Sequence, residues 1–532
     1  MRRPGAKVMA AAVGGAAMVL AAVALALRPE QPAAAVPVNR AAAMDPDYSG
    51  VTMPPNIAPL NFRVLEPGRE FFVRVSGSGA RAIEVFSKDG VIRIPAGQWR
   101  ALVGASRGGE LQVEIFAKSN EGWVQFETVR NRVAPEEIDP YVVYRLIPPV
   151  YNKWDHITIR QRDLRSFEER IVLDNKESLD REGRSAESAC VNCHTFLNHG
   201  TKQMLLHMRP AQRHQIPAVI LVQDGRARMV DTRGAGAPPA AYISWHPSGR
   251  LLAFSRNRLV QLFHTAGEET REVVDLNSDL GLYDVDSGKT YTVPQISRSE
   301  RLETFPAWSP DGKFLYFSSA AAWADKPNAV LDYNKVRYDL VRASYDAAAN
   351  RWGEVETLVS AQEFGRSVSL PQVSPDGRFV LFCGHDYGSF PIYQPSSDLY
   401  LLDLTQLDPK RGAGGATPRR LEEINSPHTD SYHSWSSNGR WVLFSSKRSD
   451  GVFARLYLSY VEASGRFHKP FILPQEDPKF YERCLMTFNR AELIREGVTV
   501  AVEELVRVMR EASGRQAEQK GAPMDTPWQP LR

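Results

Sequence analysis

A pair of apolar strands around a short polar turn recurs along the second half of the chain. Each copy centres on Pro-Asp-Gly or a close variant, and the copies span residues 243–255, 306–318, 370–383 and 433–445. Their turn glycines are 63, 65 and 62 residues apart, and are Gly249, Gly312, Gly377 and Gly439. Asp-Gly and Asn-Gly permit the positive φ angles that a tight hairpin needs. The pattern therefore predicts a repeated antiparallel unit.

A further pair of alternating strands follows each of these hairpins, so that each unit has four antiparallel strands. Four-stranded units in tandem are typical of a β-propeller. We expect apolar strands at 156–173 and 217–232 to complete one or two more blades. We expect a mainly β protein whose propeller, residues 134–490, has about six blades, with five or seven as alternatives. A β-sandwich with fortuitous hairpins is the competing architecture.

Two other segments flank the predicted propeller. Alternating strands before residue 133 favour a small β-sandwich domain over residues 48–133. After residue 490, apolar residues recur at helical spacing, which predicts an amphipathic helix from Ala491 to about Gly514. We expect this helix to pack on the propeller, and the rest of the segment 491–532 to be a polar tail.

The first 47 residues have the pattern of an export signal followed by a linker. Arg2 and Arg3 precede an uncharged apolar run, residues 8–27, which is long enough to span a bilayer. The position of these two arginines puts the bulk of the chain outside the cytoplasm. We expect a periplasmic protein held at the inner membrane by residues 8–27, with cleavage of a signal peptide as the alternative.

The charge balance excludes one class of partner. The chain has 532 residues, with 65 Lys and Arg against 62 Asp and Glu, so its formal net charge is only +3. This gives no electrostatic basis for binding nucleic acid.

The four cysteines include one motif with specific chemistry, Cys190-Val191-Asn192-Cys193-His194. Two cysteines three apart, followed directly by histidine, form the attachment signature of haem c. Cys190 and Cys193 would form the thioether bonds, and His194 would be the proximal iron ligand. A zinc site or a redox dithiol is the alternative, since further histidines lie downstream.

The distal iron ligand is sought in the segment after the motif. We expect residues 186–212 to be a haem-bearing insertion in the propeller, with a helix at 201–208 that presents Met204 and His207 on one face. His207 is the first candidate, Met204 is the second, and His199 lies too close to His194 to reach the opposite haem face. Of the other cysteines, Cys383 is expected as a buried strand thiol rather than as a disulfide partner of Cys484.

The repeats at 303–319 and 368–383 resemble the TolB-type propeller family through their Trp-Ser-Pro-Asp-Gly hairpin. Residues 55–490 are also similar to exported bacterial proteins that join such a propeller to one Cys-x-x-Cys-His motif. The segments that carry this likeness include Ile57-Ala-Pro-Leu-Asn-Phe62, Asp139-Pro-Tyr-Val-Val-Tyr144 and the motif itself. The resemblance implies the architecture and a single haem c, and it implies no reaction.

Three functions are compatible with these features. The first is a monohaem cytochrome that transfers electrons with a docked protein partner, because no Gly-x-Ser-x-Gly elbow or α/β domain follows the propeller and there is no Walker or dinucleotide-binding loop. The second is a haem-dependent periplasmic oxidoreductase with a site in the propeller mouth. The third is an envelope interaction scaffold in which the haem is structural or sensory. No catalytic residues can be assigned from the sequence, and whether the protein is an enzyme stays open at this stage.

Overall fold

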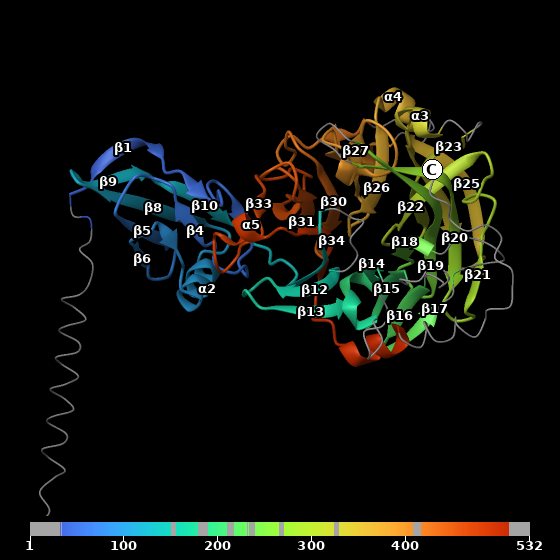
Figure 1. Cartoon of the computed structure of the whole chain (residues 1–532), viewed down its shortest axis with the longest axis horizontal. Coiled ribbons are helices and arrows are strands. Elements are labelled where there is room, and N and C mark those ends of the chain that lie inside the picture. Colours follow the sequence, from blue (N-terminus) through green and yellow to red (C-terminus); the bar gives the residue numbers. More distant parts are fainter. Residues whose placement is uncertain are drawn as a thin grey trace, which may run out of the picture.

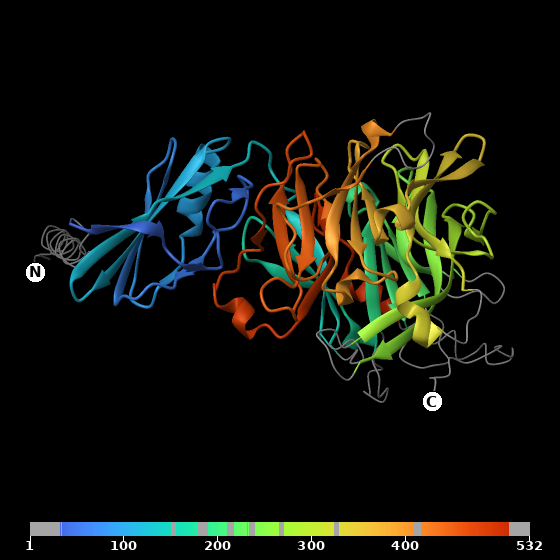
Figure 2. The same ribbon diagram turned by 90° about the horizontal axis from the view of Figure 1, so that it is seen from above.

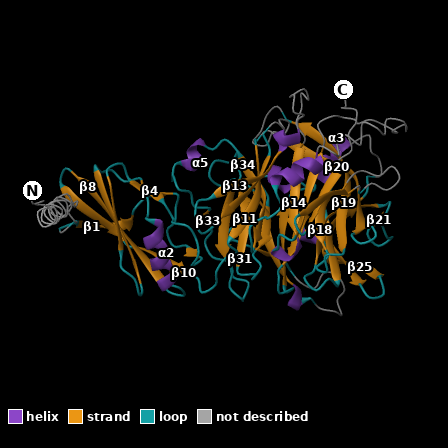
Figure 3. Ribbon diagram, turned by 90° about the horizontal axis from the view of Figure 1, so that it is seen from below, coloured by secondary structure: helices purple, strands orange, loops and turns teal. Residues whose placement is uncertain are grey.

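The computed structural model describes residues 32, 34–149, 156–178, 190–209, 218–230, 232, 240–264, 271–323, 329–407 and 417–509. The expected signal or anchor segment at 8–27 lies outside these residues. Strands dominate the fold (Figure 3), and the molecule has two parts that lie side by side, with the N-terminal part in blue in Figure 1.

The N-terminal part consists of two sheets and one helix. A seven-stranded sheet combines β1 (Val36–Ala41), β3 (Thr52–Met53), β5 (Glu70–Gly77), β6 (Ile83–Ser87), β8 (Glu110–Ser119), β9 (Gly122–Glu127) and β10 (Val129–Val133). A three-stranded sheet combines β2 (Met44–Asp45), β4 (Phe62–Val64) and β7 (Val91–Ile92), and the helix is α2 (Ala96–Ala105). Buried residues of both sheets share one apolar cluster. The sandwich includes β1, so it begins before residue 48, which we had set as its first residue.

The second part is a β-propeller of six four-stranded sheets in the described part of the chain (Figures 1 and 2). In sequence order, the blades are β11 (Tyr141–Ile147), β12 (Thr158–Asp163) and β13 (Glu169–Asp174) with β34 (Thr487–Ile494); β14 (Cys190–Phe196), β15 (Gln203–Arg209), β16 (Ala218–Gln223) and β17 (Arg226–Val230); β18 (Ala240–Trp245), β19 (Leu251–Phe263), β20 (Arg271–Asp284) and β21 (Lys289–Tyr291); β22 (Arg301–Trp308), β23 (Phe314–Ala321), β24 (Asp339–Asp346) and β25 (Arg351–Val359); β26 (Ser367–Val373), β27 (Phe379–His385), β28 (Asp398–Asp403) and β29 (Arg419–Arg420); and β30 (Asp430–Trp435), β31 (Trp441–Ser446), β32 (Arg455–Tyr460) and β33 (Phe471–Ile472).

The described helices of the propeller are short. They are α3 (Ala329–Asp332), α4 (Ala361–Phe364) and α5 (Phe480–Arg483), with 3-10 turns η1 (Asn175–Ser178), η2 (Leu197–His199), η4 (Tyr333–Lys335), η5 (Pro391–Tyr393) and η6 (Leu404–Gln406).

The ring is closed by strands from both ends of the propeller sequence. In the first blade, β34 pairs antiparallel with β11, so the last described strand is the inner strand of the first sheet. The inner strands β34, β14, β18, β22, β26 and β30 contact one another in a closed circuit. Separate apolar clusters fill the spaces between neighbouring blades, as Val143 of β11 and Leu206 of β15 do between the first two. This burial of apolar surface stabilises the ring.

A register shift typical of a β-bulge interrupts each inner strand at the corresponding position. On five of the six inner strands, one non-glycine residue has a φ between 46° and 55°; these residues are Tyr242, Phe305, Leu370, Tyr432 and Arg490. By strand pairing, Asn192 holds the equivalent place on β14. Bulges commonly redirect side chains beside functional sites.

The region of the cysteine motif differs from our expectation. Residues 190–196 and 203–209 are the strands β14 and β15 of the second blade, whereas we expected an insertion with a helix at 201–208. On β15, alternate residues face opposite sides of the sheet. Met204 therefore packs in the apolar cluster between the first two blades, and His207 faces the other way. The run Gln-Met-Leu-Leu-His-Met-Arg satisfies the period of a strand, which the helical interpretation overlooked.

The C-terminal helix begins later than we expected. Residues 491–494 end β34, so Leu493 lies on a strand, and helical backbone covers residues 502–509 of the described chain. Leu505, Val508 and Met509 of this helix pack with Met204 and Leu206 of the second blade. The expected packing on the propeller is therefore present. Among the described residues, no helix has the length and apolar character required to cross a bilayer.

Candidate functional site in the propeller channel

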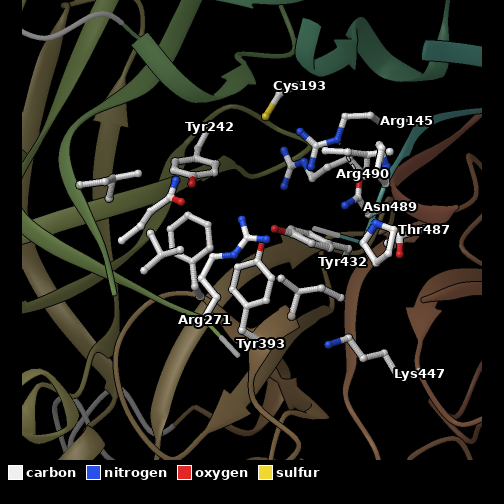
Figure 4. Close-up of a pocket in the computed structure, with 18 of the residues that line it drawn as sticks. Arg145, Cys193, Tyr242, Arg271, Tyr393, Tyr432, Lys447, Thr487, Asn489 and Arg490 are labelled. Carbon is white, nitrogen blue, oxygen red and sulfur yellow. Dashed lines mark hydrogen bonds between the residues drawn. The ribbon is translucent and has the colours of Figure 1, made fainter. Parts of the chain in front are cut away.

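The propeller axis contains a cavity of about 330 Å³, which we call the channel cavity. Its wall combines residues from several blades and from η5, as Figure 4 shows for the labelled side chains. Leu259 and Gln261 of β19, together with Arg271 and Val273 of β20, also border it. These four residues belong to the distal half of a long hairpin that pairs from Leu251↔Asp284 to Phe263↔Arg271. The extension of this hairpin forms part of the cavity wall.

A second cavity of about 560 Å³ lies next to the first along the axis. Its wall includes Trp245, Trp308 and Trp435 from the repeated hairpins. Tyr242, Tyr432 and Arg490 border both cavities, so the two cavities meet at these side chains. All three are bulge residues with positive φ. Three of the bulges thus lie where the two cavities meet.

The wall of the channel cavity is strongly cationic. Arg145, Arg271, Lys447 and Arg490 border it, and no Asp or Glu is among its described lining residues. Nε of Arg145 donates to Oδ1 of Asn489 over 2.8 Å. The guanidinium of Arg271 lies 4.8 Å from the ring centre of Tyr393. Because ordinary cavity walls are mainly apolar with a few polar groups, four cations around this volume mark it as a candidate binding site.

Two residues of the predicted haem site share this cavity. Cys193 and His207 both border it, and the sulfur of Cys193 points into the space that Tyr242 and Arg145 also face (Figure 4). His207 is buried on the adjacent strand β15. The side chain of Cys190 lies outside the described side chains.

His194 lies on the other face of β14. Its Nε2 is 3.2 Å from the carbonyl oxygen of Val143 on β11, to which it donates, and its Nδ1 is buried with no hydrogen-bond partner among the described residues. Burial, reinforced by the charges of Arg490 and Arg145, lowers the pKa of His194 to about 3, so the imidazole is neutral. His194 pairs with Leu206, which faces the first blade, whereas His207 faces away from it.

These residues match a covalent haem in their chemistry but only partly in their placement. A thiol and an imidazole share one cavity, and the orphaned nitrogen of a neutral His194 has the character of a metal ligand whose other nitrogen is fixed by a carbonyl. In extended backbone, however, Cys193 and His194 point to opposite faces of the strand. Ligation by His194 therefore requires residues 190–194 to leave the strand geometry and the contact with Val143 to break.

The remaining candidates are placed away from the cavity. Met204 is fully buried among apolar residues, and His199 bonds through Nδ1 to the carbonyl oxygen of Leu493 beside the second cavity. Cys383 is a buried thiol on β27, and Cys484 is also free, so the disulfide alternative is not formed. Among the described residues, no group of three or more His, Cys, Asp or Glu side chains lies close enough together to hold a metal ion.

The cationic residues of the channel cavity were not identified from the sequence. Arg145, Arg271, Lys447 and Arg490 are distant from one another in the chain and lie in no common motif. One sequence signal for this cavity was available. Arg490 is a charged residue at the inner-strand position that Tyr432 holds in another blade.

Comparisons with known proteins define no family for this chain. No family model matches it, and no curated protein matches it. Solved structures that are similar include prolyl oligopeptidase B from Galerina marginata, with 11% identity, a TM-score of 0.35, and coverage of 63% of this chain and 51% of that one. Others are an oligogalacturonate lyase from Vibrio parahaemolyticus (13% identity, TM-score 0.32, 80% and 98% coverage) and the propeller domain of the Trilobed protease from Pyrococcus furiosus (10%, 0.31, 68% and 82%). The chain spans about half the length of the prolyl oligopeptidase. One of these titles, that of the Trilobed protease, names a β-propeller domain. The likeness carries no function to this chain.

Proposed function

We propose that the protein is an exported monohaem c-type cytochrome on a propeller scaffold, which transfers electrons with a docked protein partner. The observation that carries this proposal is the Cys-x-x-Cys-His sequence, whose second cysteine borders the channel cavity. Cys190 and Cys193 would hold the haem, and His194 would be the proximal ligand. A haem bound there would supply one-electron oxidation and reduction.

The channel favours His207 over Met204 as the distal ligand. His207 borders the same cavity as Cys193, whereas Met204 lies within an apolar cluster on the opposite face of β15. We propose that the chain works in the periplasm, held at the inner membrane by residues 8–27, and that its partner is a redox protein or an envelope complex.

The test is the visible spectrum of the full chain, expressed in a host with c-type haem maturation. We expect haem that stays attached after denaturation, and loss of this attachment in Cys193→Ala. Cys383→Ala, which removes a buried cysteine that forms no disulfide, is the matched control and should keep its haem. A wild-type protein without covalent haem would overturn the proposal.

Axial ligation is tested separately from attachment. His207→Ala should convert a six-coordinate low-spin spectrum into a high-spin one, while His199→Ala should leave it unchanged. If Met204→Leu changes the spectrum and His207→Ala does not, the assignment of His207 is wrong.

A second candidate function is a haem-dependent oxidoreductase with its site in the channel. The cavity beside Cys193 favours it, because a volume of about 330 Å³ can hold a small substrate. Rapid binding of carbon monoxide to the reduced protein would indicate an open iron position and support this function over electron transfer alone.

A further inference from the structure

The strand β14 holds the cysteine motif in a conformation that is incompatible with covalent haem. Cys193 borders the channel cavity, whereas the imidazole of His194 lies against the carbonyl oxygen of Val143 in the first blade. In a strand, neighbouring side chains point to opposite faces. One planar group cannot be bonded to Cys193 on one face of the sheet and ligated by His194 from the other.

We infer that residues 190–194 have two conformations, with Thr195 and Phe196 as the hinge between them. In the haem-free chain, these five residues are the first part of β14 and pair with β15. In the haem-bearing chain, they are detached from β15, while residues 195 and 196 stay paired. This inference rests on the proposed function, because the second conformation exists only when haem is attached.

The C-terminal end of β14 is fastened to the closing strand β34, which locates the hinge. The backbone N–H of Phe196 donates to Oε2 of Glu492 over 3.2 Å, and the ring of Phe196 is buried in the apolar cluster between the first two blades. Directly after the strand, Nδ1 of His199 lies 2.9 Å from the carbonyl oxygen of Leu493, and the N–H of Arg495 donates to the carbonyl oxygen of His199. None of these contacts involves residues 190–194, so all of them can persist when the motif moves.

The first part of β14 is interrupted at the motif itself. The register pairs Val191 with Met208 and His194 with Leu206, so two residues of β14 oppose one residue of β15 between these pairs. This arrangement is typical of a β-bulge, which disrupts the ladder locally. Release of the segment gives up the burial of Val191 in the apolar cluster and the hydrogen bond from His194 to Val143.

The two conformations have a consequence for the order of assembly. A ligand shifts an equilibrium between two states only by the difference in its affinity for them. Covalent haem with His194 as ligand fits the detached state alone, so it favours that state, whereas the apolar cluster and the pairing with β15 favour the strand. Attachment therefore has to precede the pairing of residues 190–194, or to wait for their local opening.

The test compares the full chain with and without haem, using a side chain that is buried in only one conformation. Val191 is fully buried in the strand, so Val191→Ala should lower the thermal unfolding midpoint of the haem-free chain. In the haem-loaded chain, we expect this shift to fall to less than about half, because Val191 has already left the cluster. Val222→Ala is the matched control, since Val222 of β16 is also fully buried in the same cluster, and its shift should be equal in both forms.

Two further measurements locate the moving segment. Phe196→Leu should shift the midpoint equally in both forms, because Phe196 stays in the cluster. Hydrogen exchange gives a measure that needs no variant. Amides of residues 206–209 on β15 should exchange about tenfold faster or more in the haem-loaded chain, while those of β17 should not change.

Equal shifts for Val191→Ala in both forms, or unchanged exchange at residues 206–209, would overturn the inference. If Phe196→Leu loses its effect in the haem-loaded chain, the whole of β14 detaches and the hinge at residues 195 and 196 is wrong. The haem content is established first, from the spectrum after denaturation. A chain without covalent haem contradicts the proposed function and removes the second conformation with it, whereas a haem-loaded chain with equal shifts contradicts this inference alone.

Discussion

Asp275 gives the sharpest prediction of how this propeller responds to pH. It lies on β20, at the base of the hairpin extension that carries Arg271 into the channel cavity. Its Oδ2 accepts a hydrogen bond of 2.9 Å from Nδ2 of Asn257, and the Tyr338 hydroxyl lies 3.5 Å away. Burial raises the pKa of Asp275 from 3.8 to about 7, although its hydrogen bonds act in the opposite direction.

The sign follows from proton linkage. Because the pKa is higher in the folded state, the folded protein holds the proton that the unfolded chain has already released, and stability falls as pH rises from about 4 to about 7. Each unit of pKa difference corresponds to about 1.4 kcal/mol. The penalty from this carboxyl is then about 2 kcal/mol at pH 5 and about 4 kcal/mol at pH 8, as order-of-magnitude values.

The variant Asp275→Asn removes this titration and keeps an oxygen that can accept from Asn257. We expect the stability of the variant relative to the wild type to increase by about 2–3 kcal/mol between pH 5 and pH 8. Denaturant unfolding followed by tryptophan fluorescence at several pH values measures this difference. The control is Asp286→Asn, which removes a carboxyl from an exposed turn and so relieves no burial cost.

A stability difference between Asp275→Asn and the wild type that stays constant from pH 4 to pH 8 would refute the reasoning. It would mean that the carboxyl is solvated in the folded protein, or that the hairpin extension opens without unfolding the blade. Hydrogen exchange of the β19–β20 amides separates these two explanations.

Two further predictions concern packing. Gly312 and Gly108 both have positive φ, 72° and 74°, but a Cβ on Gly312 would lie 2.4 Å from Nε2 of His246, whereas a Cβ on Gly108 would meet no atom within 4 Å. Gly108→Ala should therefore cost about 1 kcal/mol from backbone strain, and Gly312→Ala about 1–3 kcal/mol more, as measured by denaturant unfolding. Leu443→Ala, at a fully buried site, should cost about 2–5 kcal/mol and lower the melting temperature, whereas Leu331→Ala, at a site 76% exposed, should leave it nearly unchanged. Equal effects within either pair would contradict the assigned environments.

The propeller could be predicted from the sequence because its signal is local. Each hairpin turn contains the residues that a tight turn needs, and the spacing of Gly249, Gly312, Gly377 and Gly439 gives the repeat directly. The same local reasoning was wrong at residues 201–208. An apolar run of this length fits a buried strand as well as a helix, and only pairing with β14 and β16 decides between them.

The candidate site could be predicted only in its covalent part. Cys190, Cys193 and His194 are adjacent in sequence, so the motif is readable, but the face on which each side chain lies depends on strand pairing. The cations of the channel cavity are brought together only by closure of the ring, through which β34 places Arg490 beside Arg145 of β11. No short window of the sequence contains this information.

The bulges connect the architecture to the site more closely than the motif does. A non-glycine residue in the left-handed region costs on the order of 1–3 kcal/mol, and the propeller bears this cost on five inner strands. The residues at these positions differ in chemistry, so no single side chain accounts for the conformation; what they share is a place on the channel wall. Three of these residues, Tyr242, Tyr432 and Arg490, border both cavities. A glycine at such a position would relieve the backbone strain but would remove the side chain that shapes the channel, which explains how a strained conformation can serve the binding site.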